Sequence, residues 1–569
     1  MNAGPEGGPT IAHDERRPDA APADEVPRRP SPIRSTRRST DAVRPGRGRV
    51  AGPAVASGVG LALSLPPWGL WVLAYPAAGL LWWRLGGLRP RTRLWAGWLA
   101  GLGCFLPGLL FARAFTLAGA AVLIAIEALF IGVACLAVPR GPVVARALAF
   151  PAAMTLAEAA RQSWPFGGLP IGGVFLGQAG GPVLGVARLG GPLGLTAAVF
   201  LGGVAIGAFG SAAVRAGRDL ADGHREPAPR AGEPVGTRRH SRNRTTGTLL
   251  TTGAVALVAL VASGVVAAHA PDGGPSVGTV SAVAVQGGGV RGFRKSQVDP
   301  ATVLAAAVAA TGPLTHRARG TGPRLVLWPE DVVSLEGPLD GSAEEAALAR
   351  LAVSLDATLV VGVTETLSDR AFRNEVVAFG PDGSVVSRYE KVHRVPFGEY
   401  VPLRPLFSHL GDLSAVPRDA VPGAGSGLLT TPAGPLGAMI SFEVFYAARG
   451  RSSVRAGAQL LVVPTNTSSY ASAQVPTQEV AASEVQAVQQ GRDLLQAAPT
   501  GYSAWVTHRG DLVARSVLGA RQVVPAVLHR RSGSTVYVRW GDGPVTGASL
   551  LALAAGWWLS VRRRRPTYS

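Results

Sequence analysis

Long apolar segments in two parts of the chain limit its possible folds more than any other feature of the sequence. Several of them reach the roughly 20 residues that a helix needs to cross a bilayer. The first two are shorter, and only Pro66, Pro67 and Gly69 separate them. We predict an α-helical polytopic membrane domain of about eight spans. The segments lie at 50–66, 67–83, 95–112, 115–138, 143–160, 190–212, 247–268 and 543–561.

The strong positive charge of the chain has an explanation in the membrane. The net charge is +19, although 47% of the residues are hydrophobic and only 16% are charged. The arginines gather in short flanks beside the apolar segments, which is the pattern of cytoplasmic loops in membrane proteins. The sequence has no RRM, zinc-finger or helix-turn-helix signature. We therefore expect the lipid bilayer, and no nucleic acid, as a partner.

The same arginines predict the orientation of the spans. About eight spans place every basic flank on the cytoplasmic side at once. Both termini are then cytoplasmic, and the polar region 275–540 is extracytoplasmic. The basic flanks lie in the N-terminal tail and at 84–93, 140–146, 213–246 and 562–565.

Shifts in composition predict the remaining boundaries. Residues 1–48 are rich in Pro, Arg, Ala, Asp and Glu and have no apolar period, which is typical of a disordered basic cytoplasmic tail. The rest of the chain divides into a transmembrane bundle (49–212), a cytoplasmic linker (213–246), a transmembrane helix (247–268), an α/β domain (275–540), a transmembrane helix (543–561) and a basic cytoplasmic tail (562–569).

The region 275–540 alternates short apolar runs with helical patterns, which predicts one soluble α/β domain with helices packed outside a mixed or layered sheet. Helices are expected at 300–310, 343–355 and 474–495. Strands are expected at 280–285, 325–328, 358–363, 374–379, 436–440, 460–463, 501–506 and 535–539.

The two cysteines, Cys104 and Cys135, both lie inside apolar segments. They cannot form a disulfide framework or a multi-cysteine zinc site, and we expect both to be small buried residues. The sequence has no Walker motif, and its Gly-rich stretches lack the strand–helix context of a nucleotide site. We therefore expect no metal and no cofactor.

The segment Trp164–Pro170, with the sequence WPFGGLP, is too broken for a plain helix. It begins a Gly-rich apolar stretch that runs to Gly191. Two interpretations stay open. The segment is either re-entrant or interfacial and faces a lipid-accessible cavity, or it is an ordinary outer loop.

Three expected strands end in groups that can do chemistry. Glu330 follows the run Leu325–Trp328, where partial burial raises the pKa of a carboxyl toward the range of a general base. Ser441 and Glu443 follow the strand expected at 436–440 and enter an expected helix. The N–H groups at the N-terminus of a helix stabilise a developing anion. Glu330 could equally cap the next helix or meet water.

Lys391 lies in the segment Arg388–Pro402, RYEKVHRVPFGEYVP, which follows an expected hairpin turn at 379–383. Its prolines and its glycine restrict the backbone, so the segment can hold Lys391 and Glu399 at defined positions. A solvated charged loop is the simpler interpretation of such a stretch.

These motifs resemble the apolipoprotein N-acyltransferase family of bacterial membranes. The matching strings are WPE at 328–330, YEKVHRVPFGEYVP at 389–402 and SFE at 441–443, and the resemblance covers nearly the whole chain. It implies a protein of the cytoplasmic (plasma) membrane whose nitrilase-like αββα sandwich is extracytoplasmic. It also implies transfer of an acyl chain from a phospholipid, through an acyl-enzyme, to the diacylglyceryl-cysteine of an apolipoprotein.

The resemblance also implies roles for individual residues. Glu330 corresponds to the general base, Lys391 to the group that stabilises the oxyanion, and Glu399 to the residue that orients them. Ser441 stands where the family has its nucleophilic cysteine. The other site residues that it implies are Glu443, beside the nucleophile, and Asn374, Trp328 and Phe442, as substrate-binding residues.

Serine at the nucleophile position changes the expected chemistry. A thiol becomes a thiolate after a modest pKa shift, whereas a serine hydroxyl needs a well-aligned base during attack. A second departure lies at Asn466–Tyr470, where many family members have an Asn-Asp-Ala-Trp-Phe-like string. Two alternatives to the acyltransferase stay open: a catalytically impaired paralogue that acts as a membrane scaffold or binds lipid or a partner, and a membrane-tethered amidase.

Overall fold

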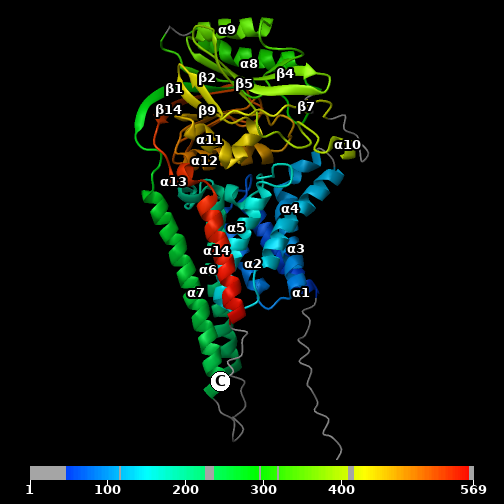
Figure 1. Ribbon diagram of the computed structural model, residues 1–569, viewed down its shortest axis with the longest axis vertical. Coiled ribbons are helices and arrows are strands. Elements are labelled where there is room, and N and C mark those ends of the chain that lie inside the picture. The colour runs from blue at the N-terminus through cyan, green and yellow to red at the C-terminus, as the bar shows by residue number, and fades with distance from the viewer. Residues whose placement is uncertain are drawn as a thin grey trace, which may run out of the picture. The chain divides into compact units, whose positions relative to one another are not determined.

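The computed structural model describes residues 47–114, 117–223, 236–293, 297–316, 320–407 and 416–562 (Figure 1). The predicted N-terminal tail up to residue 46 and the C-terminal tail after residue 562 lie outside these ranges. The predicted linker 213–246 is helical at both of its described ends, and its centre also lies outside.

Among the described residues, seven apolar helices precede the α/β region in sequence and one follows it. Within the described residues, five helices are long and apolar enough to cross a membrane by length and composition. They are α4, α5, α7, α14 and a helix that includes α6. The predicted span at 67–83 is interrupted by the turn at Pro66–Gly69, and α2 begins only at Ala74. The count of about eight spans and their orientation remain predictions. The helices are α1 Arg47–Ser64, α2 Ala74–Leu85, α3 Pro90–Gly108, α4 Leu117–Ala137, α5 Val143–Arg161, α6 Ala187–Gly223, α7 Gly236–His269 and α14 Gly543–Arg562.

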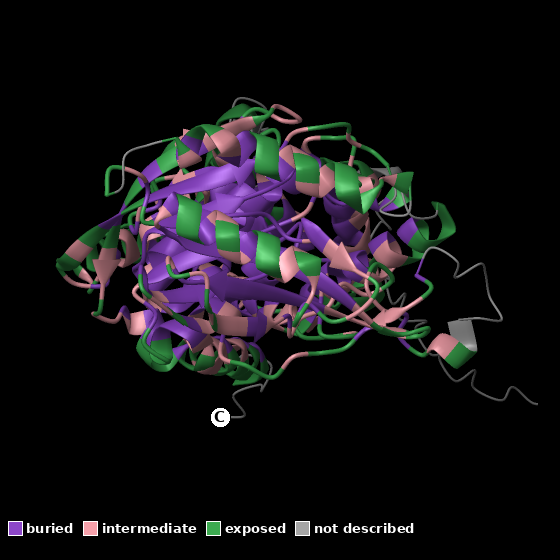
Figure 2. Cartoon of the chain, turned by 90° about the horizontal axis from the view of Figure 1, so that it is seen from above, coloured by how far each residue is buried: buried purple, intermediate pink, exposed green. Residues whose placement is uncertain are grey.

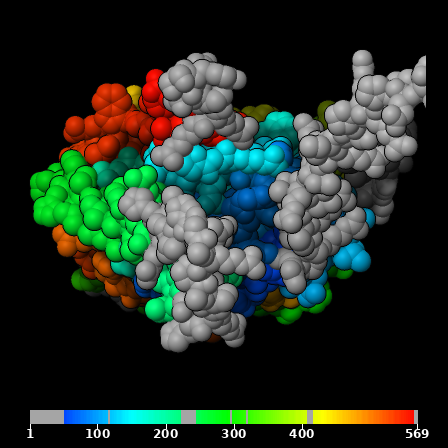
Figure 3. All heavy atoms as spheres, turned by 90° about the horizontal axis from the view of Figure 1, so that it is seen from below, coloured from blue at the N-terminus to red at the C-terminus, as the bar shows by residue number. Residues whose placement is uncertain are grey.

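Small residues let these helices approach each other closely. A Cβ atom added at Gly58 in α1 would lie 2.0 Å from the carbonyl oxygen of Ala100 in α3. One added at Gly79 in α2 would lie 2.8 Å from the carbonyl oxygen of Gly203 in α6. Such contacts are typical of helices that associate in a membrane. Figure 3 shows the blue-to-green atoms of the N-terminal helices beside the red atoms of the C-terminal helix α14.

Two sheets form the α/β domain. In the described part of the chain, the first has the order β14-β1-β2-β4-β5-β6, with β3 and β7 paired to β4 and β5, and the second has the order β13-β12-β11-β10-β9-β8. The strands are β1 Ser276–Gln286, β2 Leu325–Leu327, β3 Val333–Leu335, β4 Thr358–Ser368, β5 Ala371–Phe379, β6 Val385–Glu390, β7 Asp419–Ala420, β8 Leu428–Thr431, β9 Gly434–Ala438, β10 Leu460–Pro464, β11 Leu494–Ala497, β12 Ala504–Val506, β13 Leu512–Arg515 and β14 Gln522–Arg531.

Helices cover the outer face of each sheet, which gives the order of layers αββα. Helices α8 (Pro300–Thr315) and α9 (Ala343–Leu355) pack on the first sheet through one apolar core. Helices α11 (Ala447–Arg455) and α12 (Gln474–Gln490) lie on the second. A separate apolar core fills the space between the sheets. Seen from above, the exposed faces of helices cover buried strands (Figure 2).

Two candidate residues follow the carboxyl ends of parallel strands, one in each sheet. In the first sheet β2 pairs in parallel with β1 and β4, so Glu330 follows its carboxyl end. In the second, β9 and β10 are parallel, with Leu436 opposite Leu460, so Ser441 follows the carboxyl end of β9. Carboxyl ends of neighbouring parallel strands meet at the same edge, where ligand sites of α/β sheets collect.

Two expectations about secondary structure were wrong. Residues 535–539 form no strand, because Thr535 caps the helix α13 (Val536–Trp540) by accepting a hydrogen bond from the Val538 N–H. The helix expected at 474–495 ends at Gln490, because Gly491 adopts a left-handed φ of 65° as its C-cap. The leucines that follow belong to the strand β11.

Helix α12 joins the α/β domain to the membrane helices. The side chain of Gln474 accepts a hydrogen bond from the Phe111 N–H and donates to the Pro107 carbonyl. The Gln478 side chain accepts from the Gly172 N–H. One apolar cluster contains residues of both regions, so the helix is packed on two sides.

Candidate active site

The antiparallel hairpin of β5 and β6 places Lys391, as its sequence predicted. Lys391 comes directly after β6, and its backbone N–H donates to the Asn374 carbonyl at 2.9 Å. The segment Arg388–Pro402 that carries it is called the lysine arm below. The side chain of Lys391 is 2% exposed, so the interpretation as a solvated charged loop is wrong at this residue.

Two carboxylates hold the buried lysine. Lys391 Nζ donates to Glu330 Oε1 and to Glu399 Oε1, at 2.8 Å each. Asn374 Nδ2 donates to the same two oxygens, at 2.9 and 3.0 Å. The other oxygen of Glu399 accepts the Val395 N–H at 2.7 Å. Lys391 and Asn374 therefore both donate to the same oxygen of each carboxylate, which restricts the positions of all four groups.

Burial and charge set the protonation of this group. Desolvation lowers the pKa of Lys391, but the attraction of Glu330 and Glu399 outweighs it and leaves the pKa above its usual value. Burial raises the pKa of Glu330 to about 7, although the charge of Lys391 opposes that rise. A charged lysine beside a carboxyl that titrates near neutral pH is suited to general base catalysis.

Ser441 occupies a strained turn after β9. Its φ is +50°, a left-handed value that is rare for residues other than glycine, and such strain is frequent at active sites. The helix expected here begins as a short 3₁₀ segment, Ser441–Phe445, before α11. Thr465 lies 3.2 Å from Ser441, between their hydroxyl oxygens, and donates to Glu479 Oε1 at 2.7 Å.

The sequence analysis missed Glu479 and Thr465. Glu479 lies in the middle of α12, where a helical pattern gives no sign of a buried carboxylate that faces a strand end. Thr465 follows β10 directly, and its place after a strand, like the places of Glu330 and Ser441, is the one signal in the sequence that points to it.

Glu443 ties the lysine arm to the serine turn. It is buried, and its Oε1 accepts the backbone N–H groups of Val392 (2.8 Å) and His393 (3.0 Å). Its Oε2 accepts the Ile440 N–H at 2.9 Å, and both oxygens contact the Tyr389 hydroxyl. With both oxygens engaged in this way, Glu443 has the contacts of a residue that fixes the backbone of the site.

The other predicted residues are distributed differently. Asn374 is in the site, as described. Trp328 is fully buried in the core beside α8, and its indole N–H donates to Thr311 at 3.0 Å, so it has no free surface toward a substrate. Phe442 is 7% exposed and packs edge-on against Tyr446, so its role in substrate binding stays a prediction.

The segment 162–173 between α5 and α6, called the bundle loop below, lies against the lysine arm. The ring of Phe166 meets that of Phe397 edge-on at 6.4 Å, and both are partly exposed. The Tyr400 hydroxyl donates to the Phe166 carbonyl at 3.3 Å, and the Tyr446 hydroxyl to the Gly168 carbonyl at 2.8 Å. The loop therefore forms part of the rim of the site.

A buried arginine, Arg161, forms hydrogen bonds with the backbone of the bundle loop. Arg161, at the end of α5, pairs with Glu127 at 3.2 Å and with Glu158 at 2.8 Å. It also donates to the carbonyls of Pro170 and Ile171, at 3.0 and 3.1 Å. The sequence does not predict this cluster, because its members come from two apolar segments and carry no motif.

Comparison with known proteins agrees with this architecture. Residues 57–205 match the family model described as the apolipoprotein N-acyltransferase N-terminal domain, and residues 296–532 match the carbon-nitrogen hydrolase model. The α/β domain is thus of the nitrilase-like, carbon-nitrogen hydrolase class, joined to a helical membrane-type domain.

Curated relatives identify the family within that class. The apolipoprotein N-acyltransferase of Mycolicibacterium smegmatis is 28% identical over 524 residues, which covers 88% of this chain and 82% of the relative. That of Geobacter metallireducens is 31% identical over 250 residues, which is 42% of this chain and about half (48%) of the relative. The chain belongs to the apolipoprotein N-acyltransferase family.

Solved structures of nitrilase-superfamily proteins also match. Saccharomyces cerevisiae Nit3 is 20% identical, with a TM-score of 0.34 over 45% of this chain and 91% of Nit3. An amidase from Nesterenkonia sp. is 18% identical, with a TM-score of 0.34 over 47% of this chain and 94% of the amidase.

Proposed function

We propose that the protein transfers a fatty acyl chain from a membrane phospholipid to the N-terminal diacylglyceryl-cysteine of apolipoproteins, through an acyl-enzyme on Ser441. The observation that carries the proposal is the buried lysine, which two carboxylates hold and which Glu443 joins, through backbone hydrogen bonds on either side, to the turn of the strained serine. The names of the relatives supply the substrate class.

Each group has a task in this proposal. Ser441 Oγ attacks the carbonyl carbon of the phospholipid ester, and the charged Lys391 stabilises the oxyanion that forms. The lysophospholipid leaves with a proton. The amine of the acceptor then attacks the ester of Ser441, and Glu330 is the general base of the transfer. Glu399 and Asn374 position Glu330 and Lys391 through the hydrogen bonds described above.

The apolar surroundings suit a lipid donor. Phe166 and Phe397 line the rim with partly exposed rings, and the bundle loop joins that rim to the membrane helices. We propose that the acyl chain reaches Ser441 from the bilayer past this rim. The proposed location is the cytoplasmic membrane of a bacterium, with several spans, both termini in the cytoplasm and the α/β domain outside.

One observation favours the alternative of a catalytically impaired scaffold. In the described structure, no hydrogen bond joins Ser441 to Glu330 or Lys391, and its hydroxyl contacts Thr465. If no base acts on the serine, the fold serves only to bind lipid or a partner.

Complementation separates these functions. Wild type, Ser441→Ala, Ser441→Cys and Glu330→Gln are expressed in a strain without its own N-acyltransferase, and lipoprotein N-termini are weighed by mass spectrometry. We expect acylation by the wild type and none by Ser441→Ala. The scaffold alternative holds if the wild type adds no chain while Ser441→Cys does, and release of ammonia from a soluble amide would indicate the amidase.

A further inference from the structure

A row of three polar side chains runs from the serine into the core beneath it. The Ser441 and Thr465 hydroxyl oxygens are 3.2 Å apart, and Thr465 Oγ1 is 2.7 Å from Glu479 Oε1. All three residues are less than 9% exposed. They come from the turn after β9, the end of β10 and the helix α12, so the fold brings them together from distant parts of the sequence.

The direction of the hydrogen bonds follows from their lengths and charges. Thr465 has one proton to donate, and a carboxylate accepts more strongly than a hydroxyl. When Glu479 is ionised, the shorter bond of Thr465, to Glu479, is the one that uses this proton. The remaining lone pairs of Thr465 then accept the proton of Ser441, so the row runs from Ser441 to Thr465 to Glu479.

Glu479 is poised to gain and lose a proton. Burial raises its pKa to about 8, and its hydrogen bond with Thr465 and the nearby Ser441 hydroxyl oppose that rise. The charged and titratable groups that interact with it are Glu330, Lys391, Tyr470 and Arg291. Its Oε2 is buried and has no hydrogen-bond partner of normal geometry in the described structure.

We propose that Thr465 and Glu479 form a proton relay that serves the oxygen nucleophile Ser441, which leaves Glu330 to take the proton of the acceptor amine. This inference rests on the proposed acyl transfer and adds residues to the same site. It gives Ser441 the aligned base whose absence favoured the scaffold alternative.

Protons balance in both halves of the reaction. In the first, the bond from Ser441 Oγ to the ester carbonyl carbon forms while its proton passes to Thr465, and the Thr465 proton passes to Glu479. The lysophospholipid oxygen departs with a proton that Glu330 has held. In the second, the amine forms its bond to carbon, its proton goes to Glu330, and the bond from carbon to Ser441 Oγ breaks. Glu479 returns its proton through Thr465 to that oxygen, and all groups are restored.

An oxygen nucleophile needs this relay more than a sulfur nucleophile does. A thiol ionises near neutral pH and leaves as a thiolate without a proton, whereas a serine oxygen must lose a proton on attack and regain it on departure. The proton relay of Thr465 and Glu479 should therefore become dispensable when Ser441 is changed to cysteine. That difference makes the relay testable apart from any structural role of Glu479.

The experiment compares Glu479→Gln in the Ser441 protein and in the Ser441→Cys background. The full chain is purified in detergent, and acyl-enzyme formation and transfer to a synthetic diacylglyceryl peptide are followed in single turnovers. We expect Glu479→Gln to slow acyl-enzyme formation on Ser441 on the order of 10²–10⁴-fold, the range of general acid–base catalysis, and to change the Ser441→Cys protein less than tenfold. The matched control is Glu484→Gln, a second buried carboxylate of α12 whose pKa burial raises to about 7.

The pH profile distinguishes proton transfer from packing. In the wild type, the rate of acyl-enzyme formation should rise with pH toward about 8, because Glu479 accepts a proton only when ionised. It should fall at higher pH, because Glu330, with a pKa of about 7, must hold the proton that the leaving group takes. Glu479→Gln should lose the rising limb. The relay is refuted if Glu479→Gln keeps the wild-type rate, if it slows the serine and Ser441→Cys proteins equally, or if it lowers the rate with an unchanged pH profile.

A second pair of variants covers the case in which Glu479→Gln disturbs folding. Thr465→Val keeps the shape of the side chain but breaks the relay, and Thr465→Ser restores the hydroxyl. Loss with Thr465→Val and recovery with Thr465→Ser support the relay, and equal rates for the two variants exclude it. If the wild type forms no acyl-enzyme at all, it is the proposed function that fails.

Discussion

At the scale of single residues, the site is a balance of buried charges. Lys391 lies between two carboxyl groups in the core, and Asn374 donates a second hydrogen bond to the oxygen of each that the lysine contacts. Breaking a buried ion pair by removing one partner costs far more than the pair contributes, because the remaining charge has no compensation. The lysine is therefore as important for the fold as for the chemistry.

Lys391→Met should both inactivate and destabilise the protein. It leaves Glu330 and Glu399 buried without their cation, and such a change costs about 3–5 kcal/mol. The free energy of unfolding is measured by thermal or denaturant melts in detergent. Adding Glu399→Gln to Lys391→Met should recover part of the stability and none of the acylation. Equal stability of Lys391→Met and the wild type would contradict this account of the ion pair.

We expect the free energy of unfolding to fall in acid because of His393. Burial, with a further effect of Arg449, lowers the pKa of His393 to about 4, and its ring stacks on Tyr446 at 4.2 Å. The unfolded chain then binds more protons than the folded one between pH 6.5 and about 4. The contribution of this residue is complete above pH 6.5 and is lost as the pH falls. His393→Phe should weaken the pH dependence of the melting temperature in that window, and an unchanged dependence would argue against a neutral buried histidine.

At the scale of elements, the sequence predicted what local pattern controls. The hairpin that carries Lys391 and the strand ends at Glu330 and Ser441 follow from short apolar runs and turn residues. The partners of Ser441 did not, because Thr465 and Glu479 reach the site only through the pairing of β9 with β10 and the packing of α12. Strand pairing and helix packing join residues that are distant in sequence, and a single sequence carries little record of them.

The contact between α12 and the bundle loop predicts a change in local protection. Gln478→Leu removes the acceptor of the Gly172 N–H, and an unsatisfied buried donor costs about 1–3 kcal/mol. Hydrogen exchange should become faster in peptides that cover 162–186 and stay unchanged in the sheets. The control is Thr477→Ala, a neighbour whose hydroxyl bonds only within its own helix, to Ala473 and Gln474. Faster exchange in both variants would exclude a specific effect of Gln478.

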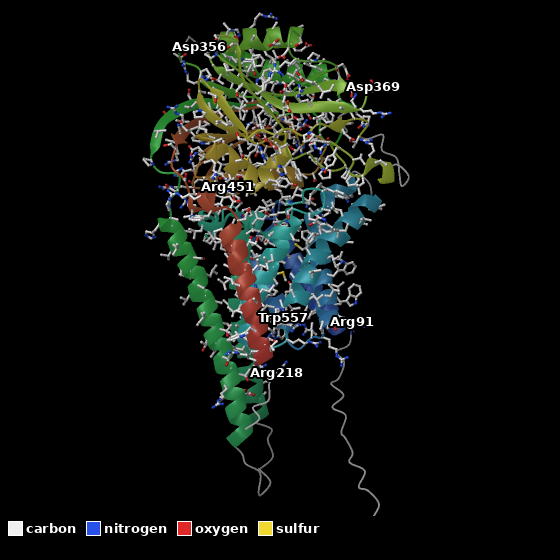
Figure 4. All side chains as sticks on the ribbon, viewed as in Figure 1. Arg91, Arg218, Asp356, Asp369, Arg451 and Trp557 are labelled. Carbon is white, nitrogen blue, oxygen red and sulfur yellow. The ribbon has the colours of Figure 1, made fainter. Side chains whose placement is uncertain are left out.

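At the scale of the whole molecule, composition predicted a helical region and an α/β domain, and the family resemblance predicted the class of that domain. The carbon-nitrogen hydrolase domain and a helical region with several apolar helices are both present. The orientation depends on arginines in short flanks, a statistical rule about loops that packing does not test. Figure 4 labels Arg91, Arg218 and Trp557 toward one end of the helices, and Asp356 and Asp369 in the α/β domain.

Cysteine labelling tests the predicted orientation directly. Cys104 and Cys135 are buried, so a new cysteine on the surface can be labelled without removing them. In intact spheroplasts, a membrane-impermeant maleimide should label Asp369→Cys in the exposed turn between β4 and β5. It should reach Arg218→Cys only after the membrane is opened. The reverse pattern would place the α/β domain in the cytoplasm.

Helix α12 has a consequence for attempts to divide this protein. All of its residues except Thr477 are buried, although five of its seventeen positions are glutamine and two are glutamate. A helix on the outside of a soluble domain keeps one polar face in water, whereas here the membrane helices and the bundle loop cover that face. A fragment that contains only the α/β domain would expose apolar side chains beside amides that have lost their backbone partners. We expect such a fragment to aggregate. The membrane helices would then be required for the stability of the α/β domain as well as for its attachment to the membrane.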